Sequence, residues 1–96
     1  MVVKLEWTQA ALAQLEQALD FIAQDDPRAA DKLWRKVEAA TKTLLRFPRK
    51  GRMVSEYQDP DVLELIVGPF RILYFTYDPE VIQINVVFRG GQSFPG

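Results

Sequence analysis

The sequence predicts an α+β fold in which an N-terminal strand is followed by an antiparallel helix hairpin and then by a three-stranded antiparallel meander. The helices are predicted by two stretches whose apolar residues recur at helical spacing, with a short Asp-Asp-Pro link between them. The meander is predicted by three apolar runs that only two or three turn residues separate. One helix hairpin can cover one face of such a sheet and leaves the other face open.

The first strand and the first helix occupy the N-terminal quarter of the chain. Residues from Val2 to Trp7 alternate in polarity, as a short strand does. Thr8 then offers a hydroxyl that can cap the following helix, which we expect to end near Gln24. The apolar stripe of this helix consists of Leu12, Leu15, Leu19 and Ile22, widened by Ala11 and Ala18.

The second helix is predicted to begin at Asp26 and Pro27. An aspartate caps a helix through its carboxylate, and a proline fits the first turn because no N–H is needed there. The link is short enough that the two helices form an antiparallel hairpin or a sharp corner. Phe47-Pro48 ends the helix. Its apolar face consists of Ala30, Leu33, Trp34, Val37, Ala40, Thr41, Leu44 and Leu45, and its opposite side carries Arg28, Lys32, Arg35, Lys42 and Arg46.

The C-terminal half begins with a predicted loop over residues 49–61 and continues with the meander. Gly68-Pro69 and Asp78-Pro79-Glu80 are the turns, and turns this short force antiparallel neighbours. The first turn pairs Val67 with Phe70, and the second pairs Tyr77 with Val81. The three predicted strands are Val62–Val67, Phe70–Tyr77 and Val81–Phe88.

This register sorts the meander residues onto two faces, because successive side chains of a strand point to opposite sides. The face expected under the helices carries Leu63, Leu65, Ile72, Tyr74, Ile82, Ile84 and Val86. The open face carries Val62, Glu64, Ile66, Arg71, Leu73, Phe75, Gln83, Asn85, Val87 and Arg89. No further element is predicted to cover it. The open face is therefore either a half-solvated sheet or a binding surface for a partner, and we favour the partner.

Composition narrows the chemistry that is available. The 96 residues predict a single domain, 1–96, and they include neither cysteine nor histidine. Thiolate chemistry and the usual general base are therefore excluded, and we expect no metal and no cofactor. The N-terminus has no signal-peptide pattern and no stretch is apolar enough for a membrane span, so we expect a cytoplasmic protein.

The charges are unevenly distributed along the chain. Residues 28–52 carry nine lysines and arginines and only two acidic residues, whereas the segments on either side are each acidic by about four charges. The net charge is −1. This near-neutral total argues against broad electrostatic wrapping by a nucleic acid. The basic side of the second helix is most simply interpreted as a solvated face.

Three segments resemble the RelE/ParE family of bacterial toxins. They are Ile22–Ala30 at the helix junction, Leu44–Arg52 with the pattern FPxxGR, and Phe70–Tyr74 with the pattern RILY. The resemblance implies a type II toxin that a co-encoded antitoxin neutralises by wrapping it and often by adding to its sheet. It also implies that the third meander strand lies away from the N-terminal strand.

The family contains two activities, and the resemblance implies one of them. RelE-like members cleave mRNA on the ribosome, with Arg52, Arg71 and an assisting Lys50 as the candidate catalytic residues here. ParE-like members inhibit DNA gyrase without a nuclease mechanism. Many relatives end in a motif like HGRRxxP, but this chain has Arg89 at the histidine position and Gly91 and Gln92 at the basic pair. Because an arginine is a poor proton shuttle, we favour the ParE-like activity, with no catalytic site.

The residue assignments follow from that choice. Arg52, Arg71 and Arg89 are predicted to bind the target, although Arg71 could simply pair with Glu64, and Arg52 with a carbonyl or a carboxylate. The antitoxin is predicted to bind Ile66, Leu73, Phe75 and Val87 on the open face. Trp7 and Trp34 are assigned to the core, and Tyr74 to a structural role. The alternatives are the ribosome-dependent mRNA endonuclease and a binding module of toxin ancestry that no longer poisons a target.

Overall fold

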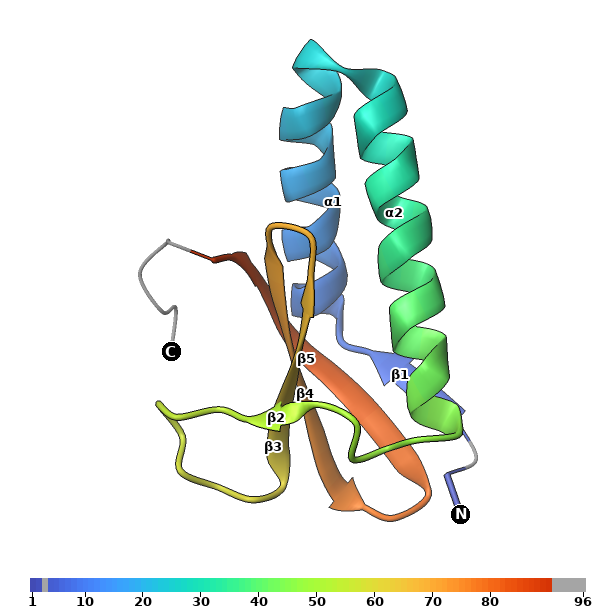
Figure 1. Cartoon of the computed structure of the whole chain (residues 1–96), viewed down its shortest axis with the longest axis vertical. Coiled ribbons are helices and arrows are strands. Elements are labelled where there is room, and N and C mark those ends of the chain that lie inside the picture. Colours follow the sequence, from blue (N-terminus) through green and yellow to red (C-terminus); the bar gives the residue numbers. More distant parts are fainter. Residues whose placement is uncertain (3, 91–96) are drawn as a thin grey trace.

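The chain folds into one five-stranded sheet with a helix hairpin on one face, as the computed structural model shows for residues 1–2 and 4–90 (Figure 1). The predicted α+β order is confirmed, and the strands lie in the order β1-β5-β4-β3-β2. The end of the hairpin that joins the two helices projects beyond the sheet (Figure 1). The elements are β1 (Lys4–Trp7), α1 (Gln9–Asp25), α2 (Pro27–Lys42), the 3-10 helix η1 (Thr43–Leu45), β2 (Arg52–Met53), β3 (Val62–Val67), β4 (Phe70–Asp78) and β5 (Val81–Arg89).

Both helices begin at the residues predicted to cap them. The Thr8 hydroxyl accepts a hydrogen bond from the backbone N–H of Ala11 at 3.1 Å, and the Asp26 carboxylate accepts one from Ala29 at 3.1 Å. Each cap satisfies a backbone N–H that has no partner within its helix. Pro27 lies in the first turn of α2, as predicted. The two helices therefore form the expected antiparallel hairpin.

The edges of the sheet differ from the prediction. β1 pairs in parallel with β5, with Leu5 opposite Ile82, so the expectation that the third meander strand lies away from the first strand is wrong. The expected loop over residues 49–61 also contains β2, which pairs with β3 and forms the other edge. Because β2 occupies the β3 side of the meander, the outer side of β5 remains for β1. The chain between β1 and β5 passes through the helix hairpin and through β2, β3 and β4, and a connection this long allows the two strands to lie parallel.

A shift in register between β4 and β5 corrects the assignment of faces. Tyr74 lies opposite Ile84, but Leu73 lies opposite Val86, so that Asn85 is an extra residue in β5. Such a bulge reverses the alternation of the residues that follow it. Val86 therefore packs on the open face and Val87 in the core under the helices, the reverse of the prediction. Val67 does pair with Phe70, but the second turn pairs Asp78, not Tyr77, with Val81.

The second face of the sheet is partly covered by the chain itself, contrary to the expectation that no element covers it. Val54 is fully buried there and packs with Val62, Leu73 and Phe88. The segment that follows β2 thus provides a second small core. This segment was predicted as a loop because its many polar residues hide the one buried valine.

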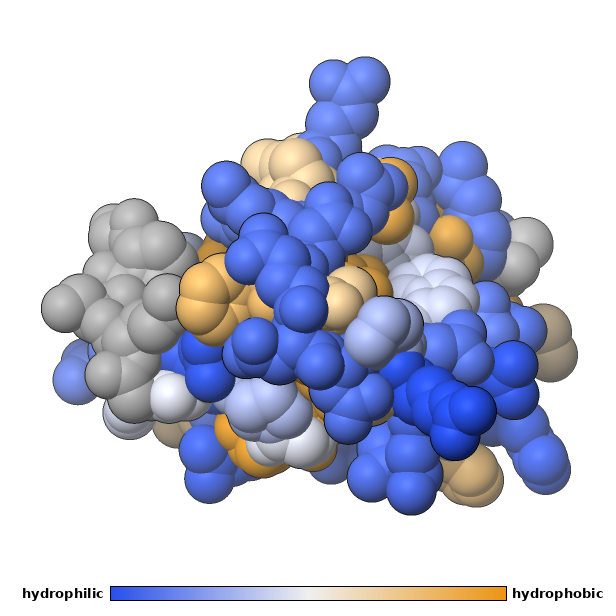
Figure 2. All heavy atoms as spheres, turned by 90° about the horizontal axis from the view of Figure 1, so that it is seen from above, coloured by the Kyte–Doolittle hydropathy of each residue, from blue (hydrophilic) through white to orange (hydrophobic). Residues whose placement is uncertain are grey.

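Several predicted core residues lie at the surface. Trp34 is 36% exposed, so its assignment to the core is only partly right, and Leu12 and Leu45 of the predicted apolar faces are 37% and 38% exposed. Seen from above, the end of the molecule where the helix hairpin projects is mostly hydrophilic with separate hydrophobic patches (Figure 2). Over residues 1–2 and 4–90, neither helix is long and apolar enough to cross a membrane.

Candidate functional site: a neutral arginine–glutamate cluster

Arg52 and Arg71 come together on the open face around one glutamate. β2 places Arg52 directly opposite Glu64 of β3, and β4 places Arg71 diagonally across from it. The Nε of Arg52 donates to Glu64 Oε1 at 2.8 Å, and the Nε of Arg71 donates to Glu64 Oε2 at 2.8 Å. The RILY and FPxxGR segments thus meet at one carboxylate, which bears out the alternative in which each arginine pairs with an acidic residue.

A second glutamate closes the cluster from the loop side. The two terminal nitrogens of Arg71 each donate to an oxygen of Glu56 at 3.1 Å. The Arg71 guanidinium also lies 4.9 Å from the centre of the Phe88 ring. Two cations and two anions give the cluster no net charge. Glu56 was not predicted, because an acidic residue in a polar loop carries no sequence signal for a partner.

Burial differs sharply among the four members. The side chain of Glu64 is 2% exposed and that of Arg71 is 19% exposed, whereas that of Arg52 is 68% exposed. A buried carboxylate requires compensation, and the two arginines provide it. The outer edge of Arg52 remains accessible to a binding partner, but most of Arg71 is committed to holding the two glutamates.

Neither Glu56 nor Arg71 is suited to moving a proton near neutral pH. Hydrogen bonds from Arg71 lower the pKa of Glu56 from 4.5 to about 2, so this carboxylate is a weak base. The same hydrogen bonds to Glu56 raise the pKa of Arg71 above its already high value. An effective general acid or base has a pKa near the working pH. What the cluster offers chemically is fixed positive charge on Arg52.

The other candidate proton donors lie elsewhere. The Nζ of Lys50 donates to the Thr43 hydroxyl at 3.4 Å, at the end of the helix hairpin. Tyr77 is six residues from Arg71 along β4, roughly 20 Å of extended chain. Its hydroxyl donates to Asp59, and this hydrogen bond raises the pKa of Tyr77. The hydrogen bonds of Lys50 and Tyr77 therefore hold these side chains to Thr43 and Asp59, and not to the members of the cluster.

A glycine fixes the entry of the chain into β2. The backbone N–H of Gly51 donates to the buried Tyr74 hydroxyl at 2.8 Å, which confirms a structural role for Tyr74. A Cβ added to Gly51 would lie 2.6 Å from the Glu64 carbonyl oxygen and 2.6 Å from the Tyr74 hydroxyl. The glycine of the FPxxGR segment is therefore needed for the close approach that places Arg52 opposite Glu64.

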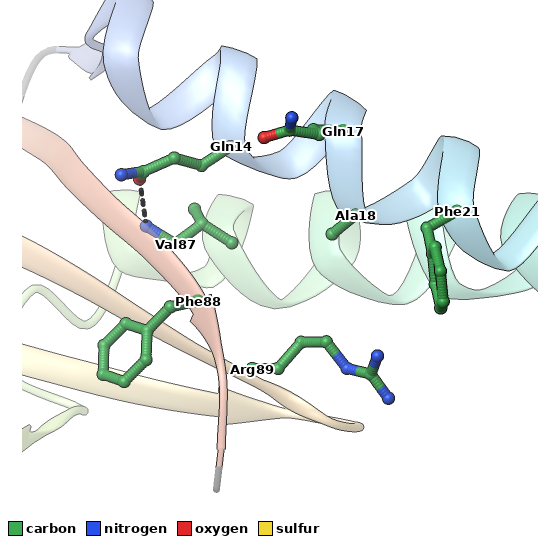
Figure 3. Close-up of a pocket in the computed structure, with 7 residues that line it drawn as sticks. All are labelled: Gln14, Gln17, Ala18, Phe21, Val87, Phe88 and Arg89. Atoms are coloured by element: carbon green, nitrogen blue, oxygen red, sulfur yellow. Dashed lines mark hydrogen bonds between the residues drawn. The ribbon is translucent and has the colours of Figure 1, made fainter. Parts of the chain in front are cut away.

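Arg89 lies on the other side of the sheet. It lines a pocket of about 440 Å³ between α1 and the end of β5, together with Gln14, Gln17 and Phe21. Figure 3 shows Phe88 and Arg89 leaving β5 in opposite directions, and Gln14 accepting a hydrogen bond from the backbone N–H of Val87 at 2.8 Å. The bulge at Asn85 turns the Arg89 side chain to the helix side of the sheet, so Arg89 does not share a face with Arg52 and Arg71.

The four apolar residues predicted to bind a partner include two that are accessible and two that are buried. Ile66 is 52% exposed and Phe75 is half-buried on the open face, so both are accessible. Leu73 is fully buried beneath Val54, and Val87 is buried under the helices, so neither presents a surface as the chain stands. The exposed neighbours that the sequence did not single out are Met53, Tyr57 and Tyr77, of which the two tyrosines flank Phe75.

Within the part of the chain that the structure describes, no three side chains from His, Cys, Asp and Glu gather closely enough to hold a metal ion. The fold and the site together define a small α+β protein whose most extensive polar network is the ion-paired cluster on one face of the sheet.

Comparison with known proteins identifies the family. The sequence profile described as "ParE toxin of type II toxin-antitoxin system, parDE" matches residues 5–94. Toxin RelE2 of Caulobacter vibrioides is 31% identical over 78 residues, which cover 80% of this chain and 84% of that toxin. A solved structure titled "Chromosomal ParDE TA system from P. aeruginosa" is 25% identical with a TM-score of 0.74, covering 92% of this chain and 96% of the matched chain. The chain belongs to the ParE toxin family of type II toxin–antitoxin systems.

Proposed function

We propose that this toxin acts in the cytoplasm by binding DNA gyrase and inhibiting it, in the ParE manner, and not by cleaving RNA. The observation that carries the proposal is the pairing of Arg52 and Arg71 with Glu64 and Glu56. RNA cleavage next to a 2′-hydroxyl needs a base, an acid and unpaired positive charge for the phosphate. The cluster supplies a carboxylate whose pKa is about 2, and it leaves only the outer edge of Arg52 as accessible positive charge, because Arg71 is held by two glutamates.

The residues proposed to meet the target are Arg52 and Arg71, with Arg89 as a separate contact on the opposite side. Arg52 is the most exposed of the cluster and can give up its contact with Glu64 at little cost, because Arg71 still holds that carboxylate. Arg71 contributes chiefly by keeping Arg52 and Glu64 in place. Arg89 would bind separately, beside the pocket between α1 and β5.

A cognate antitoxin is the second proposed partner. The matched structure is titled as a ParDE toxin–antitoxin system, and the open face of this chain exposes apolar side chains that a partner would bury. We propose that the antitoxin covers Ile66 and Phe75 and that its acidic residues meet Arg52. Leu73 and Val87 would support this surface from below instead of touching the antitoxin.

The alternative activity is a ribosome-dependent mRNA endonuclease, and it is favoured by the name of one relative, Toxin RelE2. Pulse labelling of protein and DNA synthesis, just after the chain is induced without antitoxin, separates the two activities. We expect DNA synthesis to fall first, together with a DNA-damage response. An early stop in protein synthesis while DNA synthesis continues would overturn the gyrase proposal. If neither changed, the chain would be a binding module of toxin ancestry.

A further inference from the structure

A row of basic side chains runs along one flank of α2 and continues past its end. At about 100° per residue, Lys32, Lys36 and Thr43 lie within roughly 40° of one another around the helix axis. Lys32 and Lys36 are exposed, and Lys50 reaches the Thr43 hydroxyl with its Nζ at 3.4 Å. Arg46 follows Thr43 by three residues across η1, and residues so spaced in a 3-10 helix lie on the same side. The basic row therefore consists of Lys32, Lys36, Arg46 and Lys50.

The two carboxylates of α2 lie on the other flank. Asp31 pairs with Arg35 at 3.2 Å, and Glu38 lies 4.0 Å from Lys42. By the same helical geometry both are about 100° or more away from Lys32 and Lys36. The salt bridges of α2 thus neutralise Arg35 and Lys42 and leave the flank of the basic row positive. The acidic residues that give the chain its net charge of −1 come mainly from other elements.

The structure also separates this row from the arginine cluster. Lys50 was predicted to assist Arg52 and Arg71, but its contact with Thr43 places it at the end of the row. Arg52 and Arg71 are paired with glutamates, whereas no side chain of the row takes part in a salt bridge among the described residues. The basic block of the sequence is thus divided into a neutralised part on the sheet and a positive part on the helix hairpin.

We propose that the basic row binds the phosphate backbone of duplex DNA. Lys32 and Lys36 lie on α2, and Arg46 and Lys50 continue the row past its end. From Lys32 to Arg46 the helical rise is roughly 20 Å, so these cations can follow neighbouring phosphates, which form a regular line of negative charge. Between these cations the row has small residues such as Ala39 and no large apolar anchor of the kind that dominates protein interfaces. Single-stranded nucleic acid is bound with aromatic stacking platforms. Phe47, the exposed aromatic residue next to the row, has its ring centre 5.6 Å from Cζ of the Arg46 guanidinium, which covers one face of the ring. The row therefore fits a duplex better than a single strand.

Such binding depends on phosphates and not on base sequence, and it is sensitive to salt. Each neutralised phosphate contributes about 0.9 to the slope of log K against log salt on duplex DNA, so four contacts give a slope of about −3.6. The binding does not rest on gyrase as the target. It would add contacts wherever the toxin's target presents a duplex.

The test is fluorescence anisotropy of the full chain with a 20-base-pair duplex of arbitrary sequence, over a series of salt concentrations. The double variant K32Q/K36Q removes half of the row and should weaken binding by about tenfold at low salt, with the slope falling to about −1.8. The matched control is K4Q/K42Q, which removes the same charge from exposed lysines that each lie near a glutamate. Its affinity should stay within about twofold of the parent chain and its slope unchanged.

Equal losses in the two double variants would overturn the proposal, since net charge alone would then explain binding. A salt slope that K32Q/K36Q leaves unchanged would also overturn it. Tighter binding to single-stranded RNA of the same length would point to RNA. Displacement of the duplex by polyglutamate at equal charge would point to an acidic protein partner. Circular dichroism on both variants checks that each is folded, and no gyrase is present, so the result is independent of the proposed function.

Discussion

Replacing Arg71 by alanine should destabilise the toxin far more than replacing Arg52 by alanine, although both arginines bind Glu64. In R71A, Glu64 loses its contacts with Arg71 at 2.7 and 2.8 Å and keeps only the exposed Arg52. Since the Glu64 side chain is 2% exposed, a nearly uncompensated charge is left buried. Breaking a buried pair in this way costs about 3–5 kcal/mol. In R52A, Arg71 still holds Glu64, and the loss of an exposed partner costs below about 1 kcal/mol.

The two variants should therefore differ by at least about 2 kcal/mol in the free energy of unfolding. A domain of this size has a total stability of about 5–15 kcal/mol, so R71A should lose a large part of it. A cost of 3 kcal/mol corresponds to a fall in Tm of at least about 12 °C. Urea denaturation followed by circular dichroism and by tryptophan fluorescence measures both quantities. The m-value should stay constant, because the variants and the parent chain expose the same additional surface on unfolding.

The double variant R71A/E64Q isolates the cause. If the cost of R71A comes from the buried charge of Glu64, then replacing that charge by an amide should recover a substantial part of the lost stability. A double-mutant cycle over Arg71 and Glu64 gives the coupling between them. Equal destabilisation by R71A and R52A would refute this reasoning. So would a complete absence of recovery in R71A/E64Q, which would assign the cost to lost packing against Phe88.

Four further predictions concern the turn into β2, the pH dependence, the open face and the tyrosine at the end of β4. Gly51→Ala should cost about 1–3 kcal/mol because its Cβ would meet the Glu64 carbonyl at 2.6 Å, and an unchanged urea midpoint would contradict this. Folding lowers the pKa of Glu56 from 4.5 to about 2, so its contribution to stability is present above pH 4.5 and is lost as the pH falls towards 2. E56Q should therefore lose part of the slope of stability against pH in that window. An unaltered slope would count against the Arg71–Glu56 contact. Leu73→Ala should lower the free energy of unfolding by about 2–5 kcal/mol because Leu73 is fully buried. Ile66→Ala should leave the urea midpoint nearly unchanged and weaken antitoxin binding in calorimetry. The opposite pattern would show that Leu73 is a surface residue. Asp59 raises the pKa of Tyr77, so ultraviolet titration of D59N should show Tyr77 ionising at a lower pH than in the parent chain, and an identical titration would mean that the hydrogen bond is absent in solution.

Local signals in the sequence were sufficient to predict the helices and most of the meander. Thr8 and Asp26 are capping residues whose effect is confined to the next turn, and Gly68-Pro69 permits a single tight turn. These features depend on neighbours in the chain, so the sequence predicts them directly. The order of strands outside the meander depends on long-range pairing, and the parallel contact of β1 with β5 has no local signal.

The candidate site could be predicted only in part for a related reason. Arg52 and Arg71 were identified, and the pairing of Arg71 with Glu64 was foreseen as an alternative, because both fall on the open face in the predicted register. Arg52 was expected in a loop, so its position opposite Glu64 on β2 was not foreseen. Glu56 is held by loop geometry that no periodicity encodes. Arg89 was placed on the wrong face because a bulge at Asn85 adds one residue, and alternation cannot reveal where a strand gains one.

Direct action on gyrase is the central claim, and a supercoiling assay with purified gyrase, relaxed plasmid and the purified chain tests it. We expect the chain to inhibit supercoiling and to trap gyrase on cleaved DNA, and we expect prior addition of the cognate antitoxin to abolish both effects. R52A, which should remain folded, should inhibit more weakly than the control variant K4Q. Undisturbed supercoiling at a large excess of folded chain, together with cleavage of mRNA on translating ribosomes, would contradict the account.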